Sequence, residues 1–141
     1  MKTLSAKYFK CHFELRSPGG CGLAALNSVL MMMEKRGIIY SYSPEKGISP
    51  AWILRELRRV GLKATPKTIS IRNLKGPAIL WYPGQDGGHY VAVCMVRNGK
   101  ALICDSEKSR LYWLPFPYLR KKWYRFTRGR WCGWVIEVRK E

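Results

Sequence analysis

The sequence predicts an α+β fold in which N-terminal helices pack on a C-terminal antiparallel β-sheet. Two apolar patterns with helical spacing precede Gly61, and short apolar runs rich in β-branched residues follow it. Between two of those runs lies Asn98-Gly99, a strong hairpin signal that makes neighbouring strands antiparallel. Neither an internal repeat nor a low-complexity linker interrupts the sequence, so we expect one domain over residues 1–141.

The first helix is expected to run from Cys21 to about Lys35. Its apolar residues recur at intervals of three and four: Leu23, Leu26, Leu30 and Met33. Gly37 provides a stop signal, because glycine accepts the left-handed backbone that often ends a helix. Before this helix, the chain is expected to be extended from Ala6 to Leu15 and to turn at residues 17–20.

A second helix is expected to begin at Ser49-Pro50, since serine caps a helix N-terminus and proline fits the first turn. Gly61 marks its end. The residues of its apolar face are Trp52, Ile53, Leu54, Leu57 and Val60. Its arginines, Arg55, Arg58 and Arg59, are expected to form a solvated face.

The remainder is expected to form strands, at Ile69 and Ile71 and at residues 77–82, 90–96, 100–104, 111–114 and 134–138. The hairpin at Asn98-Gly99 then brings His89 and Asp105 to the same end of neighbouring strands, within hydrogen-bonding reach. The segment from His89 to the turn is longer than the segment from the turn to Asp105. We therefore expect a bulge or looped entry at Gly87-Gly88-His89 that takes up the extra length.

Cys21 is the strongest candidate for a catalytic residue. It follows Gly19-Gly20 and opens the first helix, where unpaired N–H groups and the helix dipole favour thiolate over thiol. His89 could act as its base, with Asp105 holding the far ring nitrogen of the imidazole. The structural alternative is a buried cysteine, a strand-end histidine and a turn-forming aspartate; Asp86 is a competing acid.

Four motifs follow one another along the chain: Cys21-Gly22-x-Ala24-Ala25-Leu26, then Gly-Pro-Ala-Ile-Leu at 76–80, His-Tyr-Val-Ala-Val at 89–93, and Asp105. Their order resembles that of the bacteriocin-processing (double-glycine leader) peptidases, a family of papain-like cysteine peptidases, and more distantly that of the Josephin-type deubiquitinases. The resemblance extends over residues 21–138 and implies a papain-like scaffold with a helical half and an antiparallel sheet half; we expect no cofactor. It further implies that Cys21 is the nucleophile, His89 the general base and Asp105 its orienting partner. A peptide or protein substrate is implied, cut after a small residue such as glycine.

One departure from this family concerns the oxyanion. Its members place a Gln about six residues before the nucleophile, whereas this chain has Leu15 there, and its single glutamine is Gln85. Losing an oxyanion donor costs about 10²- to 10³-fold in turnover. Two alternatives stay open: Arg16 replaces the amide as donor, or Arg16 is a surface charge and the chain is a catalytically impaired scaffold.

The net charge of +17 results from 26 Lys and Arg against 9 acidic residues. Toward the C-terminus the basic residues alternate with aromatics, a composition that suits binding to nucleic acid or to an acidic protein partner. The candidate residues are Arg120, Lys121, Lys122, Arg125, Arg128 and Arg130. The alternative is that the aromatics are core residues and the charges form a solvated face.

Cysteine content and hydropathy indicate the cellular compartment and argue against membrane insertion and metal binding. Five cysteines without a C-x-x-C pair suit a reducing compartment, so we expect cytoplasmic residence; association with a nucleic-acid-rich particle is a hypothesis from charge alone. No apolar run approaches the roughly 20 residues needed to span a bilayer, and we expect no membrane insertion. We expect no metal site, because the adjacent Cys11 and His12 would point apart on a strand.

Overall fold

The computed structural model describes residues 20–35, 48–84, 88–108 and 110–141, and it has the predicted α+β architecture. Its elements in chain order are α2 (Cys21–Met32), α3 (Pro50–Arg59), β1 (Leu62–Ile69), the 3-10 helix η2 (Ile71–Asn73), β2 (Ala78–Tyr82), β3 (His89–Arg97), β4 (Lys100–Cys104), β5 (Tyr112–Pro115), α4 (Phe116–Trp123), β6 (Arg125–Thr127) and β7 (Arg130–Lys140). The expected extended segment 6–15, the turn at 17–19, Cys11-His12 and Gly37 lie outside the described residues.

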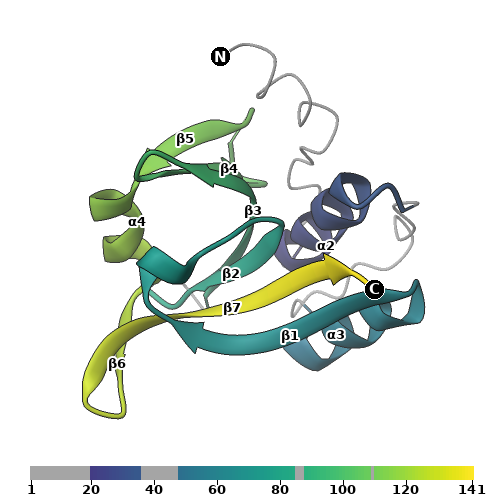
Figure 1. Cartoon of the computed structure of the whole chain (residues 1–141), viewed down its shortest axis with the longest axis horizontal. Helices are drawn as coiled ribbons and strands as arrows, with labels where there is room; N and C mark the ends of the chain where they lie inside the picture. Colours follow the sequence, from purple (N-terminus) through teal and green to yellow (C-terminus); the bar gives the residue numbers. More distant parts are fainter. Residues whose placement is uncertain (1–19, 36–47, 85–87, 109) are drawn as a thin grey trace.

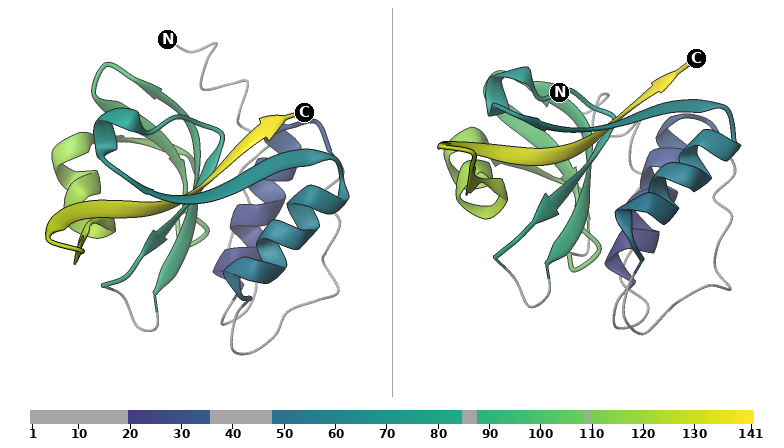
Figure 2. Two further views of the ribbon diagram at one scale, coloured as in Figure 1. Left: turned by 60° about the horizontal axis from the view of Figure 1, so that its bottom comes forward. Right: turned by 90° about the horizontal axis from the view of Figure 1, so that it is seen from below.

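Within the described part of the chain, the sheet has seven strands in the order β1-β7-β2-β3-β4-β5, with β6 paired to β7, and every pairing is antiparallel (Figure 1). Helices α2 and α3 lie side by side against one face of the sheet, whereas α4 covers the other (Figure 2). Among the described residues, β1 is the first strand in the chain and pairs with β7, the last.

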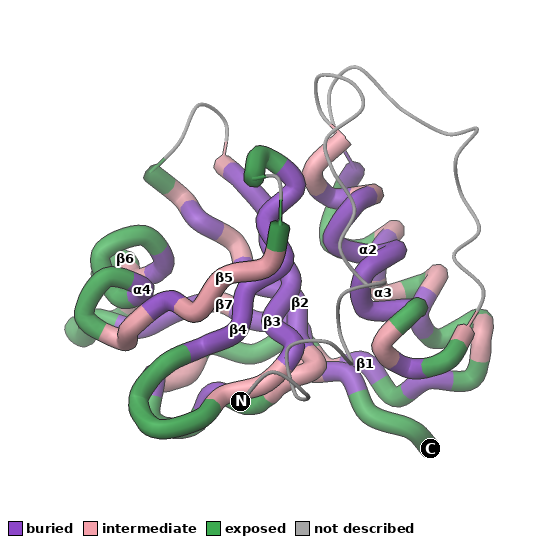
Figure 3. Tube along the Cα trace, turned by 90° about the horizontal axis from the view of Figure 1, so that it is seen from above, coloured by how far each residue is buried: buried purple, intermediate pink, exposed green. Residues whose placement is uncertain are grey.

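Each face of the sheet has its own apolar core. The core on the helix face joins α2 and α3 side chains, such as Leu26 and Leu57, to strand residues such as Ile79 and Ile136. On the opposite face, Trp123 of α4 is fully buried among the strands. Figure 3 shows the buried residues concentrated in β2, β3, β4 and the adjoining side of α2, while α4 and the β6 hairpin present exposed residues.

Helix α2 ends at Met32, before the expected end at Lys35. Glu34 has a left-handed backbone with φ of 60°, and the Lys35 N–H donates to Leu30 O at 2.8 Å. This six-to-one hydrogen bond around a left-handed residue is the Schellman geometry. A glutamate thus ends the helix where we expected Gly37 to do so.

Helix α3 confirms the predicted start at Ser49-Pro50 and end near Gly61. The Ser49 hydroxyl accepts a hydrogen bond from the Trp52 N–H at 3.2 Å, and Gly61 has φ of 87°. The predicted apolar face packs on the core: Ile53 and Leu57 are fully buried, and the other members are partly buried against the same core, namely Trp52, Leu54 and Val60. Arg58 is also more than a solvated charge, because its guanidinium donates to Ala64 O at 2.9 Å and ties α3 to β1.

Several strand bounds correct the expectation. Ile69 ends β1, whereas Ile71 lies in η2, so the two do not share a strand. Strand β7 is longer than the predicted 134–138, because it pairs with β1, β2 and β6 along its length. The helix α4 and the strand β6 were missed, since the alternation of aromatic and basic residues at 116–127 has neither helical nor strand periodicity.

The β3–β4 hairpin has its bulge within β3, whereas we expected a bulge or looped entry at Gly87-Gly88-His89, of which Gly87 lies outside the described residues. The register shifts between Val93 and Met95, which makes Cys94 the extra residue of β3. Both Cys94 and Met95 contact the helix-side core, whereas Val93 contacts the opposite one. The extra residue of the longer strand thus lies where two successive side chains pack on the same side of the sheet, toward α2.

Candidate active site

Cys21 is the first residue of α2, directly after the N-cap Gly20. The next residue, Gly22, allows the helix to approach β3 closely, because a Cβ there would lie 3.1 Å from the Tyr90 ring and from the Ile48 side chain. The start of the helix is thus held against the start of β3, one residue after His89. This packing brings together two residues that are remote in the sequence.

His89 is the first residue of β3 and is buried, with 3% of its surface exposed. It follows Gly88, whose φ of 89° and contact with Trp81 exclude a side chain, since a Cβ would overlap the indole ring. Trp81 in turn packs against Tyr90, with ring centroids 4.7 Å apart and ring planes tilted by 60°. The two aromatic rings and Gly88 therefore define the path by which the chain enters β3.

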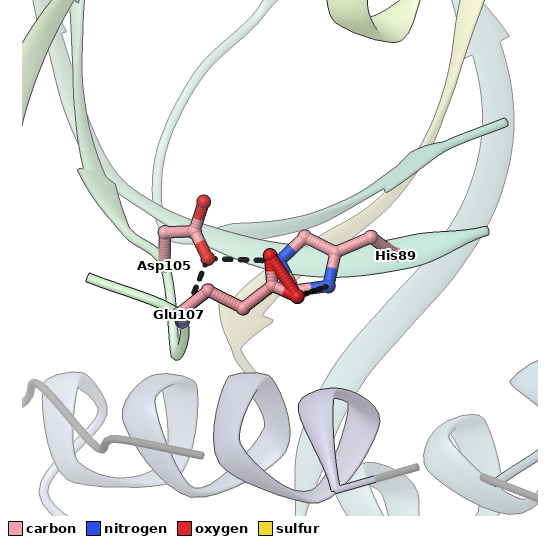
Figure 4. Close-up of polar contacts among 3 residues, drawn as sticks. All are labelled: His89, Asp105 and Glu107. Carbon is pink, nitrogen blue, oxygen red and sulfur yellow. Dashed lines mark hydrogen bonds and ion pairs between the residues drawn. The ribbon is translucent and has the colours of Figure 1, made fainter. Parts of the chain in front are cut away.

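Asp105 follows β4 directly and is buried beside the imidazole, as predicted from the hairpin. His89 Nε2 lies 2.8 Å from Asp105 Oδ1, and the Glu107 backbone N–H donates to the same oxygen at 3.0 Å (Figure 4). The carboxylate thus accepts two hydrogen bonds and defines which ring nitrogen it engages. The other ring nitrogen of His89, Nδ1, is therefore available for the hydrogen bond with Cys21.

The pKa values of Cys21 and His89 are shifted in opposite directions. Burial would raise the pKa of the Cys21 thiol, but hydrogen bonds from His89 and from the backbone N–H of Tyr90, with the charge on His89, lower it overall. Burial likewise disfavours the imidazolium, yet Asp105 and Cys21 outweigh this and raise the pKa of His89 to about 10. A thiolate beside an imidazolium is the result.

Asp105 completes this charge arrangement. Burial would raise the pKa of its carboxyl, but the hydrogen bonds from His89 and from the Glu107 N–H lower that pKa overall. The protonated ring of His89 is therefore flanked by a thiolate and a carboxylate. An imidazolium in this position holds the proton that the thiol has given up, and it can donate that proton to a departing amine.

The structure adds Glu107, which the sequence interpretation did not single out. Its Oε2 lies 3.9 Å from His89 Nδ1, and its side chain is 48% exposed. His89, Asp105 and Glu107 have potential metal-ligand atoms within 4.8 Å of one another (Figure 4). The hydrogen bond between Nε2 and Oδ1 uses two of these atoms, which favours proton transfer over metal binding at this site. In the sequence, the only sign that Glu107 belongs to this site is its position two residues after Asp105.

Other predicted site residues are placed elsewhere or lie outside the described part. Arg16, Gln85 and Asp86 lie outside the described residues. The six basic candidates are all exposed, on α4 (Arg120, Lys121 and Lys122), on β6 (Arg125), in the following turn (Arg128) and at the start of β7 (Arg130). They lie on the side of the sheet opposite α2, away from Cys21.

The aromatics among these charges divide between core and surface. Trp123 is fully buried, in line with the structural alternative. By contrast, Tyr118 is 58% exposed, Phe126 59% and Trp131 63%. Phe126 and Trp131 pair across the hairpin with ring centroids 5.5 Å apart. We call the exposed residues 118, 120–122, 125, 126, 128, 130 and 131 the basic aromatic surface.

Comparisons with known proteins agree on the fold. The peptidase domain of streptococcal ComA, a bifunctional ABC transporter of a quorum-sensing pathway, superposes with a TM-score of 0.75 at 16% identity, covering 95% of this chain and 99% of that domain. A double-glycine motif protease from an AMS/PCAT transporter, solved in complex with the leader peptide, gives 0.68 at 18% identity, with 92% and 91% covered. The peptidase C39-like domain of a toxin secretion ATP-binding protein from Vibrio parahaemolyticus gives 0.60 at 16%, with 90% and 99% covered.

In sequence, the chain is 24% identical over 151 aligned residues to the sublancin-168-processing and transport ATP-binding protein SunT of Bacillus subtilis, and equally to that of Bacillus phage SPbeta. The alignment covers 99% of this chain but only 19% of those proteins. No protein-family profile matches the chain. Among the described residues, no helix is long and apolar enough to cross a membrane. The fold is that of the papain-like peptidase C39 domains.

Proposed function

We propose that this chain is a cysteine peptidase domain that hydrolyses a peptide bond, with Cys21 as nucleophile, His89 as general base and acid, and Asp105 as orienting partner. The observation that supports this most directly is the position of His89 between the two other groups. It contacts Asp105 through Nε2 at 2.8 Å and shares a hydrogen bond with Cys21. Each of the three side chains shifts the pKa of a neighbour toward the charged form that catalysis needs.

The reaction begins with the Cys21 thiolate attacking the carbonyl carbon of the scissile bond. The resulting oxyanion forms at the N-terminus of α2, where the Cys21 N–H has no acceptor within the helix and the dipole favours negative charge. The imidazolium of His89 then gives its Nδ1 proton to the nitrogen as the C–N bond breaks. Water, deprotonated by the neutral imidazole, hydrolyses the thioester and regenerates the thiolate.

The substrate class is a peptide with a small residue, such as glycine, before the scissile bond. One structural neighbour is a double-glycine motif protease solved with a leader peptide, and the relative in Bacillus subtilis is described as sublancin-168-processing. These descriptions support a peptide substrate for the present chain. A reducing, cytoplasmic location agrees with the need for a thiolate and with the buried thiols of Cys94 and Cys104, 3.4 Å apart.

The test is cleavage of synthetic peptides that contain a Gly-Gly pair, followed by mass spectrometry. Wild-type protein should release the two fragments and form a transient thioester on Cys21, which hydroxylamine would cleave. Cys21→Ala should bind but not cut, whereas Cys132→Ala, at a buried thiol in β7 opposite Arg125 of β6, serves as the matched control. A peptide cleaved equally by Cys21→Ala would refute the assignment.

A second candidate function rests on the basic aromatic surface. Exposed aromatic rings at Tyr118, Phe126 and Trp131 are flanked by six cationic side chains. Cationic groups bind phosphates or carboxylates, and exposed rings can stack on bases. This surface could therefore bind nucleic acid or an acidic protein partner, with or without peptidase activity at Cys21.

A further inference from the structure

Glu107 lies beside the imidazole of His89, and the proposed catalytic cycle does not use this acidic residue. Its Oε2 lies 3.9 Å from His89 Nδ1, the ring nitrogen that faces away from Asp105. Among the described residues, no Lys or Arg lies within ion-pair distance of Glu107, although Lys and Arg outnumber acidic residues 26 to 9 in this chain. The carboxylate thus faces the reactive nitrogen and keeps an open side toward solvent.

The backbone holds Glu107 in this place. Its N–H donates to Asp105 Oδ1 at 3.0 Å, and this same oxygen lies 2.8 Å from His89 Nε2. One carboxylate therefore aligns both the imidazole and the start of the Glu107 side chain. That side chain is 48% exposed, so a bound group could reach its carboxylate from solvent.

The proposed chemistry creates a positive charge at this point. When the C–N bond breaks, the leaving nitrogen accepts the Nδ1 proton, which requires a separation of about 3 Å from that atom. The new α-amine has a pKa of about 8 and takes a second proton from water at neutral pH. An ammonium therefore forms next to the atom that lies 3.9 Å from Glu107 Oε2.

We propose that Glu107 forms a cation-binding subsite on the leaving-group side of the scissile bond. This inference rests on the proposed peptidase function and deepens it. The subsite would favour a substrate with Lys or Arg immediately after the scissile bond, and it would bind the α-ammonium of the released fragment. Both groups offer N–H donors to the same carboxylate, and the experiments below separate them.

The first experiment measures the local charge at Cys21 without requiring peptidase activity. Cationic aminoethyl and anionic sulfonatoethyl methanethiosulfonates each form a mixed disulfide with the thiolate and release a sulfinate. We expect the ratio of cationic to anionic rates at Cys21 to fall about 3- to 10-fold in Glu107→Gln, since a charge several Å away is removed. An unchanged ratio would overturn the proposal.

The matched control is Glu34→Gln, which removes one carboxylate at the opposite end of α2. The Glu34 side chain is 84% exposed and lies 3.8 Å from Lys140 Nζ. Because exposed charges are screened within about 10 Å in ordinary buffer, this variant should leave the rate ratio unchanged. An equal fall in both variants would mean that net charge, not a subsite, attracts the cationic reagent, and would overturn the proposal.

The second experiment compares kcat/KM for peptides with Lys, norleucine or Glu after the scissile bond. Wild type should prefer Lys over norleucine about 3- to 10-fold, and Glu107→Gln should lose that preference. To identify the α-ammonium contribution, the released fragment is tested as an inhibitor with a free and with an acetylated N-terminus. Only the free form should inhibit, and less so in Glu107→Gln.

The two assays separate failure of this subsite from failure of the peptidase assignment. If no peptide is cut by wild type, the proposed function fails, while the reagent ratio still reports on Glu107. If peptides are cut but Glu107→Gln keeps the preference for Lys, the subsite is refuted and the peptidase assignment stands.

Discussion

His89 Nε2 and Asp105 Oδ1 are 2.8 Å apart although the two residues are separated by 16 positions in the chain. The contact joins the beginning of β3 to the end of β4, across a hairpin that turns at Asn98-Gly99. It selects the ring nitrogen that faces the acid and directs Nδ1 toward the start of α2. A base oriented in this way can serve a thiol at Cys21.

Cys21 should be the most reactive of the described thiols. Its pKa is lowered by hydrogen bonds from His89 and Tyr90 against the effect of burial, whereas Cys94, Cys104 and Cys132 are buried. The pH–rate profile of iodoacetamide alkylation, with each modified cysteine located by mass spectrometry, should give Cys21 an apparent pKa below about 8.5. His89→Ala should raise that pKa. Labelling at Cys21 that is no faster than at the buried thiols would contradict the assignment.

Peptidase activity should decline as the pH rises through about 10, the raised pKa of His89, because the imidazolium that protonates the leaving amine is lost there. Asp105→Asn retains a hydrogen-bond acceptor but removes the charge, so the alkaline limb should move to lower pH. Asp105→Ala also loses the orientation and should cost on the order of 10²- to 10⁴-fold in kcat. An alkaline limb at the same pH in wild type and Asp105→Asn would show that the carboxylate does not set the pKa of His89.

Gly88→Ala should disturb both stability and reactivity. An added Cβ would overlap the Trp81 ring, and the φ of 89° is strained for any other residue, so we expect a loss of about 2 to 4 kcal/mol in the free energy of unfolding. Alkylation of Cys21 should slow because His89 is displaced. Urea unfolding and labelling rates measure the two effects. Gly84→Ala, where a Cβ would meet nothing within 4 Å, is the control and should change neither.

Arg16 allows a test of the missing oxyanion donor, although it lies outside the described residues. If its guanidinium replaces the family's glutamine, Arg16→Ala should lower kcat about 10²- to 10³-fold with little change in the alkylation rate of Cys21. Arg16→Gln should then restore part of the turnover. Equal kcat in wild type and Arg16→Ala would identify Arg16 as a surface charge.

The basic aromatic surface makes a separate prediction. If it binds single-stranded nucleic acid, affinity should fall steeply between 50 and 200 mM salt, as phosphate contacts require. Trp131→Ala should weaken binding by about 1 to 3 kcal/mol through lost stacking, and Cys21→Ala should have no effect. Fluorescence anisotropy with a labelled oligonucleotide measures both. Binding that withstands salt, or that Trp131→Ala leaves intact, would exclude this surface as the site.

The amino-acid sequence by itself determined the fold class, the start of α2 at Cys21, both ends of α3 and the β3–β4 hairpin. These features depend on local signals: apolar residues that recur at intervals of three and four positions, a serine cap before proline, and Asn-Gly between two apolar runs. The proximity of His89 and Asp105 was predictable for the same reason, since one hairpin connects them.

Only the tertiary structure decided the features that depend on packing between distant segments. The meeting of Cys21 with His89 requires Gly22 to contact Tyr90, and the bulge lies at Cys94 because Cys94 and Met95 both face the helix-side core. The place of Glu107 beside Nδ1 likewise follows from the turn that Asp105 Oδ1 closes. Periodicity records which residues share a face of one element, whereas register and close approach are set by the elements packed against it.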